Sequence, residues 1–145
     1  MSTMNPVVHF ELPAEDRKRM SKFYETAFGW KTNQLGKEMG DYVLATTTET
    51  DKDGMIKKPG AINGGFFQCP QGEKASARLT IAVDDIQASM KKITKSGGKV
   101  IGGMQKSGEP DMIPGVGLYA TFIDTEGNHL SILQPTTDMK AGGKK

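Results

Sequence analysis

The chain contains one strand–helix pattern twice, once near its start and once near its middle. Val8-His9-Phe10-Glu11-Leu12 alternates apolar and polar residues, and an acidic pair and a helical stretch ending at Gly29 follow it. Leu79-Thr80-Ile81-Ala82-Val83 opens the second copy, whose helical stretch ends at Gly97-Gly98. When Gly29 and Gly98 are superposed, His9 falls on Arg78, because each lies 20 residues before its glycine. Such repetition predicts a pseudo-symmetric fold whose halves border a shared cleft.

The composition narrows the class of protein. A length of 145 residues fits one domain, here expected over residues 1–137 with a flexible tail at 138–145. Hydrophobic residues make up 36% and charged residues 25% of the chain, which is typical of a soluble globular protein. No apolar run approaches the roughly 18 residues of a membrane helix, so no membrane partner is expected.

Charge and cysteine content exclude further classes. The net charge of +2 comes partly from lysines in the tail, and no basic stripe with interleaved aromatic residues is present, so nucleic acid is not an expected partner. The single cysteine, Cys69, rules out an internal disulfide and fits a reducing compartment. Because the start of the chain has no basic and apolar signal segment, a cytoplasmic location is expected.

Periodicity predicts a βαβββ order in each half, with modules at residues 4–70 and 76–136. In the first strand, Val8, Phe10 and Leu12 share one face, whereas His9 and Glu11 lie on the other. The predicted strands are 7–12, 30–33, 41–47, 64–69, 78–83, 99–104, 118–124 and 129–134, with helices at 14–28 and 86–95. Pro13 is expected to end the first strand, residues 70–75 to link the halves, and residues 48–60 and 107–117 to form loops.

Four motifs in this order resemble the vicinal oxygen chelate superfamily, also called the glyoxalase/bleomycin-resistance/dioxygenase family. They are the His9 strand followed by Phe23-Tyr24 and Phe28-Gly29-Trp30, then Val83-Asp84-Asp85, Gly97-Gly98-Lys99-Val100, and Asp124-Thr125-Glu126-Gly127-Asn128. The resemblance covers residues 4 to 136. It implies an α+β fold in which two βαβββ modules form a U-shaped open barrel. It also implies, for metal-using members, one divalent cation held by His, Gln or Glu on the first and last strands of each module.

The positions that match this ligand set predict no metal site. His9 stands at the first, but Gly65, Arg78 and Ser131 stand at the others. A guanidinium donates hydrogen bonds only and would repel a cation, and glycine has no side chain. Catalytic metals usually need about three protein ligands, so no cofactor is expected. A divalent metal held partly by His9 or His129 remains the alternative.

These observations favour metal-independent binding of a small organic ligand in the cleft. Arg78 is expected to hold an anionic group, unless Glu11 neutralises it. The other expected ligand-binding residues provide polar or adaptable apolar contacts: His9, Glu11, Thr80, Met104, Tyr119 and Ser131. Met112 is a further cleft candidate.

Two other classes stay open. One is a metal-dependent enzyme similar to lactoylglutathione lyase or to a dioxygenase, and only this class predicts stoichiometric metal. The other is a structural or regulatory dimer without a small ligand. A homodimer is expected in any case, because small sheets with one helix each leave edges that need cover.

Overall fold

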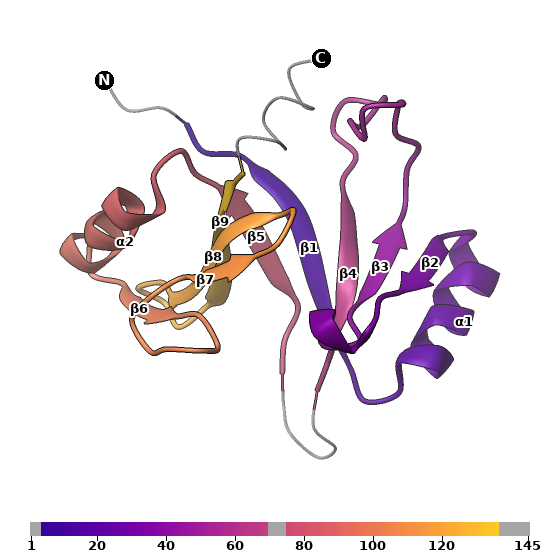
Figure 1. Ribbon diagram of the computed structural model, residues 1–145, viewed down its shortest axis with the longest axis horizontal. Coiled ribbons are helices and arrows are strands. Elements are labelled where there is room, and N and C mark those ends of the chain that lie inside the picture. The colour runs from indigo at the N-terminus through magenta and orange to yellow at the C-terminus, as the bar shows by residue number, and fades with distance from the viewer. Residues whose placement is uncertain (1–3, 70–74, 137–145) are drawn as a thin grey trace. The chain divides into compact units, whose positions relative to one another are not determined.

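The computed structural model describes residues 4–69 and 75–136, which contain nine strands and two α-helices (Figure 1). The described residues form two compact units. The first unit is His9–Arg78, and the second consists of residues 4–8 together with 79–136. The predicted α+β class and the repeated strand–helix order are confirmed. Most of the predicted linker, residues 70–74, and the predicted tail lie outside the described residues.

The first unit places α1 on one face of a mixed sheet. Its elements are β1 (Val7–Ala14), α1 (Arg17–Phe28), β2 (Lys31–Gln34), the short 3-10 helix η1 (Lys37–Met39), β3 (Val43–Thr46) and β4 (Asn63–Gln68). The strands follow the order β2-β3-β4-β1, with β4 antiparallel to β3 and parallel to β1.

Local sequence explains where α1 begins and ends. The Asp16 carboxylate accepts the backbone N–H of Arg19 at 3.0 Å, and Gly29 ends the helix in the left-handed region with φ of 72°. Tyr24 stacks on Trp30 with ring centroids 4.4 Å apart, and both pack against the buried Phe66. The helix therefore covers the sheet face that carries the apolar residues of β1.

The prediction that Pro13 ends β1 is wrong. The strand continues to Ala14, with Pro13 opposite Phe67 and the Ala14 carbonyl accepting the N–H of Cys69 at 2.9 Å. Proline lacks an N–H, but its carbonyl and those of its neighbours still accept, so a strand can run through it. The predicted helix from residue 14 accordingly begins at Arg17.

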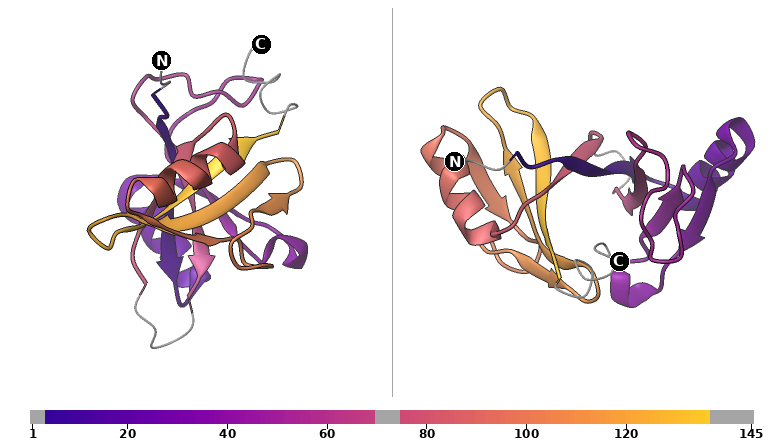
Figure 2. Two further views of the ribbon diagram at one scale, coloured as in Figure 1. Left: turned by 90° about the vertical axis from the view of Figure 1, so that its left-hand side faces the viewer. Right: turned by 90° about the horizontal axis from the view of Figure 1, so that it is seen from above.

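The second unit contains the other helix and its own set of strands. Its elements are β5 (Arg78–Ala82), whose first residue groups with the first unit, α2 (Ile86–Lys95), β6 (Lys99–Gly102), β7 (Asp111–Ile113), β8 (Gly117–Ile123) and β9 (His129–Pro135). The order is β5-β9-β8-β6, with β7 added to β8. Figure 2 shows α2 along one side of this sheet.

A buried cluster around Ile86 and Met90 holds α2 to its sheet. Phe122, Ile132 and Ala120 complete this cluster. The Asp85 carboxylate caps the helix, accepting the N–H of Ala88 at 3.1 Å. Neither helix in the described ranges has the length and apolar character needed to span a lipid bilayer.

The Asp124–Asn128 motif builds the turn before β9. One Asp124 carboxylate oxygen accepts the backbone N–H groups of Glu126 at 2.8 Å and Asn128 at 2.9 Å. The Asn128 side chain donates to the other oxygen and, together with these backbone bonds, lowers the pKa of Asp124. These bonds give the motif a role in local structure.

Candidate functional site

The two faces of β1 carry different kinds of side chain, apolar on one and polar on the other. Phe10 and Leu12 pack into the cluster under α1, so alternation turns His9 and Glu11 to the opposite face. There Glu11 stands opposite Gly65 of β4. We call this side of the first unit its polar face.

Tyr42, just before β3, occupies the space that Gly65 leaves open on the polar face. A Cβ added to Gly65 would lie 2.1–2.2 Å from the end of the Tyr42 ring, so any other residue at position 65 would displace that ring. The Tyr42 hydroxyl lies 3.0 Å from Nε2 of His9 and donates to the Glu11 carboxylate at 3.1 Å. His9, Glu11 and Tyr42 form what we call the tyrosine cluster.

Hydrogen-bond counting fixes the proton positions in the tyrosine cluster. A phenol has a single proton, and Glu11 accepts it, so Nε2 of His9 must carry the proton that it donates to Tyr42. Burial lowers the pKa of His9 below 6.5, and the nearby Glu11 charge opposes this shift in part. His9 is therefore neutral at pH 7.

Arg78 sits on the ring of Phe67. Its guanidinium carbon lies 4.7 Å from the ring centroid, within the range of a cation–π contact. Within residues 4–69 and 75–136, Arg78 takes part in no ion pair, so the predicted alternative in which Glu11 neutralises it is not observed. Phe67 stands two residues after Gly65, on the same face of β4.

The predicted residues of the second unit form a closed hydroxyl pair. Thr80 of β5 and Ser131 of β9 are register partners, and their hydroxyl oxygens lie 2.8 Å apart. Both side chains are buried, Ser131 completely. Each hydroxyl has a partner and no exposed surface, so this pair has the character of a core contact.

Met104 lies between β6 and β7, whereas Tyr119 shares a face of the sheet with Ser131, because its partner Leu133 stands two residues after Ser131. The Met104 side chain is 95% exposed between β6 and β7, and its backbone N–H donates to Asp111 at 2.6 Å. Met112, in β7, is 63% exposed. Tyr119 is half-buried in β8, opposite Leu133.

Tyr42 is the residue that the sequence prediction missed, although the internal repeat contains a signal for it. Gly65 and Ser131 stand at equivalent positions of the two units, so Phe67 and Leu133, each two residues later, are equivalent as well. Val43 pairs with Phe66, so Tyr42 continues that register opposite Phe67, whereas Tyr119 pairs with Leu133. Tyr42 is thus the repeat partner of Tyr119, which was predicted. Extending the equivalence of the two units from β4 and β9 to the neighbouring strands β3 and β8 would have identified Tyr42.

The donor set does not fit a superfamily-type metal ion. Tyr42 fills the place of a side chain at Gly65, and Ser131 is buried against Thr80. Among the described residues, no group of three or more His, Cys, Asp or Glu side chains could hold a metal. A cation would also have to displace the proton that His9 shares with Tyr42.

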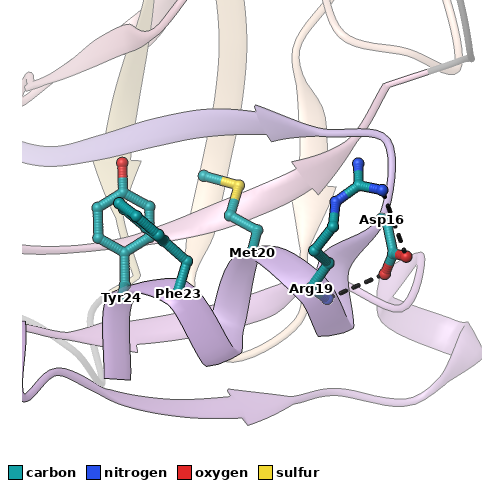
Figure 3. Close-up of a pocket in the computed structure, with 5 residues that line it drawn as sticks. All are labelled: Asp16, Arg19, Met20, Phe23 and Tyr24. Carbon is teal, nitrogen blue, oxygen red and sulfur yellow. Dashed lines mark hydrogen bonds and ion pairs between the residues drawn. The ribbon is translucent and has the colours of Figure 1, made fainter. Parts of the chain in front are cut away.

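A shallow hollow on the exposed side of α1 is a separate feature. It is lined by Asp16, Arg19, Met20, Phe23 and Tyr24 (Figure 3). All five come from one helix and its cap, and its charged groups, Asp16 and Arg19, pair with each other at 3.9 Å. The hollow therefore lacks the converging polar groups of a specific ligand site.

Comparison with known proteins places this geometry in context. A family model described as a glyoxalase-like domain matches residues 8–133. A glyoxylase-like domain-containing protein from Didymella fabae is 32% identical over 121 residues, which cover 81% of this chain and 84% of that protein.

Solved structures show the same fold at low identity. A Streptomyces coelicolor methylmalonyl-CoA epimerase variant in complex with 2-nitronate-propionyl-CoA gives a TM-score of 0.65 at 14% identity, covering 93% of this chain and 100% of the epimerase chain. The Mycobacterium tuberculosis methylmalonyl-CoA epimerase gives 0.62 at 13% identity, covering 93% and 91%. Identities this low carry the fold alone.

Proposed function

The chain belongs to the glyoxalase-like family of the vicinal oxygen chelate superfamily, and from this premise we propose that it binds a small organic molecule on the polar face of its first unit without a metal ion. The observation that carries the proposal is the placement of Tyr42 over Gly65. This placement puts a hydrogen-bonding phenol where metal-using members of the superfamily have a ligand.

Two features support a small and anionic ligand. Arg78 supplies a half-buried cation without an acidic partner among the described residues, which favours an anion beside it. Two of the similar epimerase structures are complexes with 2-nitronate-propionyl-CoA and with methylmalonyl-CoA, so proteins of this fold bind organic ligands. The alternative is a metal-dependent enzyme of the lyase or dioxygenase kind. Such an enzyme would need a metal centre, which the tyrosine cluster does not provide.

Backbone amide NMR of the full chain tests this proposal. Small organic acids should be titrated in the presence of a metal chelator. We expect saturable shifts at amides near Tyr42, Phe67 and Arg78 and none near Thr80 or Ser131. Binding that requires added divalent metal, or no binding by any small organic molecule, would overturn the proposal.

The predicted homodimer is a separate proposal. Exposed apolar residues such as Phe23 at 56% and Phe28 at 65% on α1 provide surface for association. Light scattering at tens of micromolar should give twice the chain mass of 15.7 kDa. A single-chain mass would refute it.

A further inference from the structure

The polar face of the first unit also carries apolar side chains. Phe66 packs under α1, so strand alternation turns Phe67 to the polar face. Leu44 stands opposite Gly65 and shares that face, where its side chain is 40% exposed. Leu44 and Phe67 are thus diagonal neighbours across β3 and β4, with Cα atoms roughly 7–8 Å apart. We call these two side chains the apolar strip.

The apolar strip is continuous and short. Gly65 is adjacent to both of its members and has no side chain, and the end of the Tyr42 ring fills the space over it. Asn63, two residues before Gly65, pairs with His9, so polar side chains border the strip on that side. The strip therefore suits the apolar part of a small molecule, a short chain or a single ring.

Arg78 lies at the Phe67 end of the apolar strip. Its guanidinium carbon is 4.7 Å from the Phe67 ring centroid, and its side chain is half-buried. Within residues 4–69 and 75–136 it takes part in no ion pair. A partly desolvated cation favours an anion beside it, and a carboxylate can accept two hydrogen bonds from one guanidinium. A carboxylate bound to Arg78 brings the rest of its molecule within reach of the strip.

A cation next to an exposed apolar strip fits an amphiphilic anion. We infer that the polar face recognises monocarboxylic acids with a short apolar body, such as hexanoate. The carboxylate binds Arg78, and the apolar body lies over Phe67 and Leu44. A second charged group at the far end would be desolvated against Leu44, which lowers affinity. This inference rests on the proposed function and adds the ligand class to it.

Four ligands that differ in one property each test the inference, by backbone amide NMR of the full chain with a metal chelator present. Hexanoate should bind more than about tenfold more tightly than butanoate, because its longer chain buries more apolar surface. Hexanamide lacks the charge, and adipate carries a second carboxylate in place of the terminal methyl. Both should bind at least about tenfold more weakly than hexanoate. The saturable shifts should include the amides of Leu44, Phe67 and Arg78.

Variants then assign the two contacts. Arg78→Met should weaken hexanoate about 30-fold and leave hexanamide unchanged. Leu44→Ser should weaken hexanoate about tenfold and butanoate less than about threefold, because the shorter chain ends before Leu44. Met55→Ser is the matched control: it removes an apolar side chain of similar exposure, 43%, from the loop between β3 and β4. It should change none of these affinities.

Thermal melts of each variant separate loss of binding from loss of fold. Equal affinities for butanoate, hexanoate and adipate would overturn the inference and leave the proposed function standing, since acids would still bind at the polar face. Equal losses of hexanoate affinity in Leu44→Ser and Met55→Ser would overturn it as well. Failure of hexanoate to bind would also overturn it. The proposed function then stands if another small organic molecule shifts the amides near Phe67 and Arg78, and falls if none does.

Discussion

Equivalent strand positions in the two units carry different polar side chains. In the first unit, Glu11 stands opposite Gly65, and in the second, Thr80 stands opposite Ser131. The Thr80 and Ser131 hydroxyls hydrogen-bond to each other and are buried. In the first unit the missing side chain at Gly65 admits Tyr42, which brings a carboxylate, a phenol and an imidazole together. The missing side chain at Gly65 thus separates a cluster of three polar side chains from a buried hydroxyl pair.

The largest expected effect comes from adding that Cβ. Gly65→Ala would collide with the end of the Tyr42 ring, expel it and break both of its hydrogen bonds. We expect a loss of about 3 kcal/mol in the free energy of unfolding, measured with urea. In a Tyr42→Ala background the same change should cost less than about 1 kcal/mol. Equal costs in both backgrounds would show that Gly65 does not make room for Tyr42.

A change in the second unit should affect stability alone. Thr80→Val removes one hydroxyl and leaves that of Ser131 buried without its partner, which should cost about 2 kcal/mol of unfolding free energy. Adding Ser131→Ala should recover part of this loss, because both polar groups are then gone. Organic acid binding should stay unchanged. If Thr80→Val instead weakens binding in a protein that stays folded, the contrast between the units is wrong.

Tyr42→Phe is the milder change in the first unit. The ring stays over Gly65, but the contacts to His9 and Glu11 are lost, which should cost about 1.5 kcal/mol by urea unfolding.

The smallest expected effect is a pH dependence of stability between pH 8 and 5 that comes from His9 in the first unit. Burial lowers the pKa of His9 from 6.5, so the folded state favours the neutral imidazole. This contribution to stability is complete above pH 6.5 and is lost as the pH falls through the lower folded-state value. Unfolding measured from pH 8 to 5 should show the decline in the native chain and a weaker decline in His9→Gln. Parallel curves for the two proteins would contradict this assignment.

Local sequence signals predicted the frame of the fold because they act over a few residues. Gly29 marked the end of α1, whose start was predicted at residue 14 instead of Arg17, and Ile86–Lys95 is α2 as predicted. The strand β7 was missed inside the predicted loop 107–117, because its three residues gain strand structure only by pairing with β8. Pro13 was taken as a strand end because its missing donor is visible in sequence, whereas its β4 neighbour is not.

The site was predictable only in part, for the same reason. Alternation put His9 and Glu11 on one face, and the structure joins them through Tyr42. Tyr42 itself follows a turn at Gly40 and Asp41, and its place depends on a glycine 23 residues later in the chain. No short pattern contains that relation. The stacking of Arg78 on Phe67 depends in the same way on tertiary structure.

Calorimetric titration of the full chain with zinc, nickel, manganese and ferrous iron tests the central claim most directly. That claim is that Tyr42 over Gly65 replaces a metal centre by a hydrogen-bonded site. We expect no one-to-one site with a sub-micromolar Kd, since such affinity corresponds to more than about 8 kcal/mol and the tyrosine cluster offers one imidazole and one carboxylate. A one-to-one site of that affinity, lost in His9→Ala, would contradict the account.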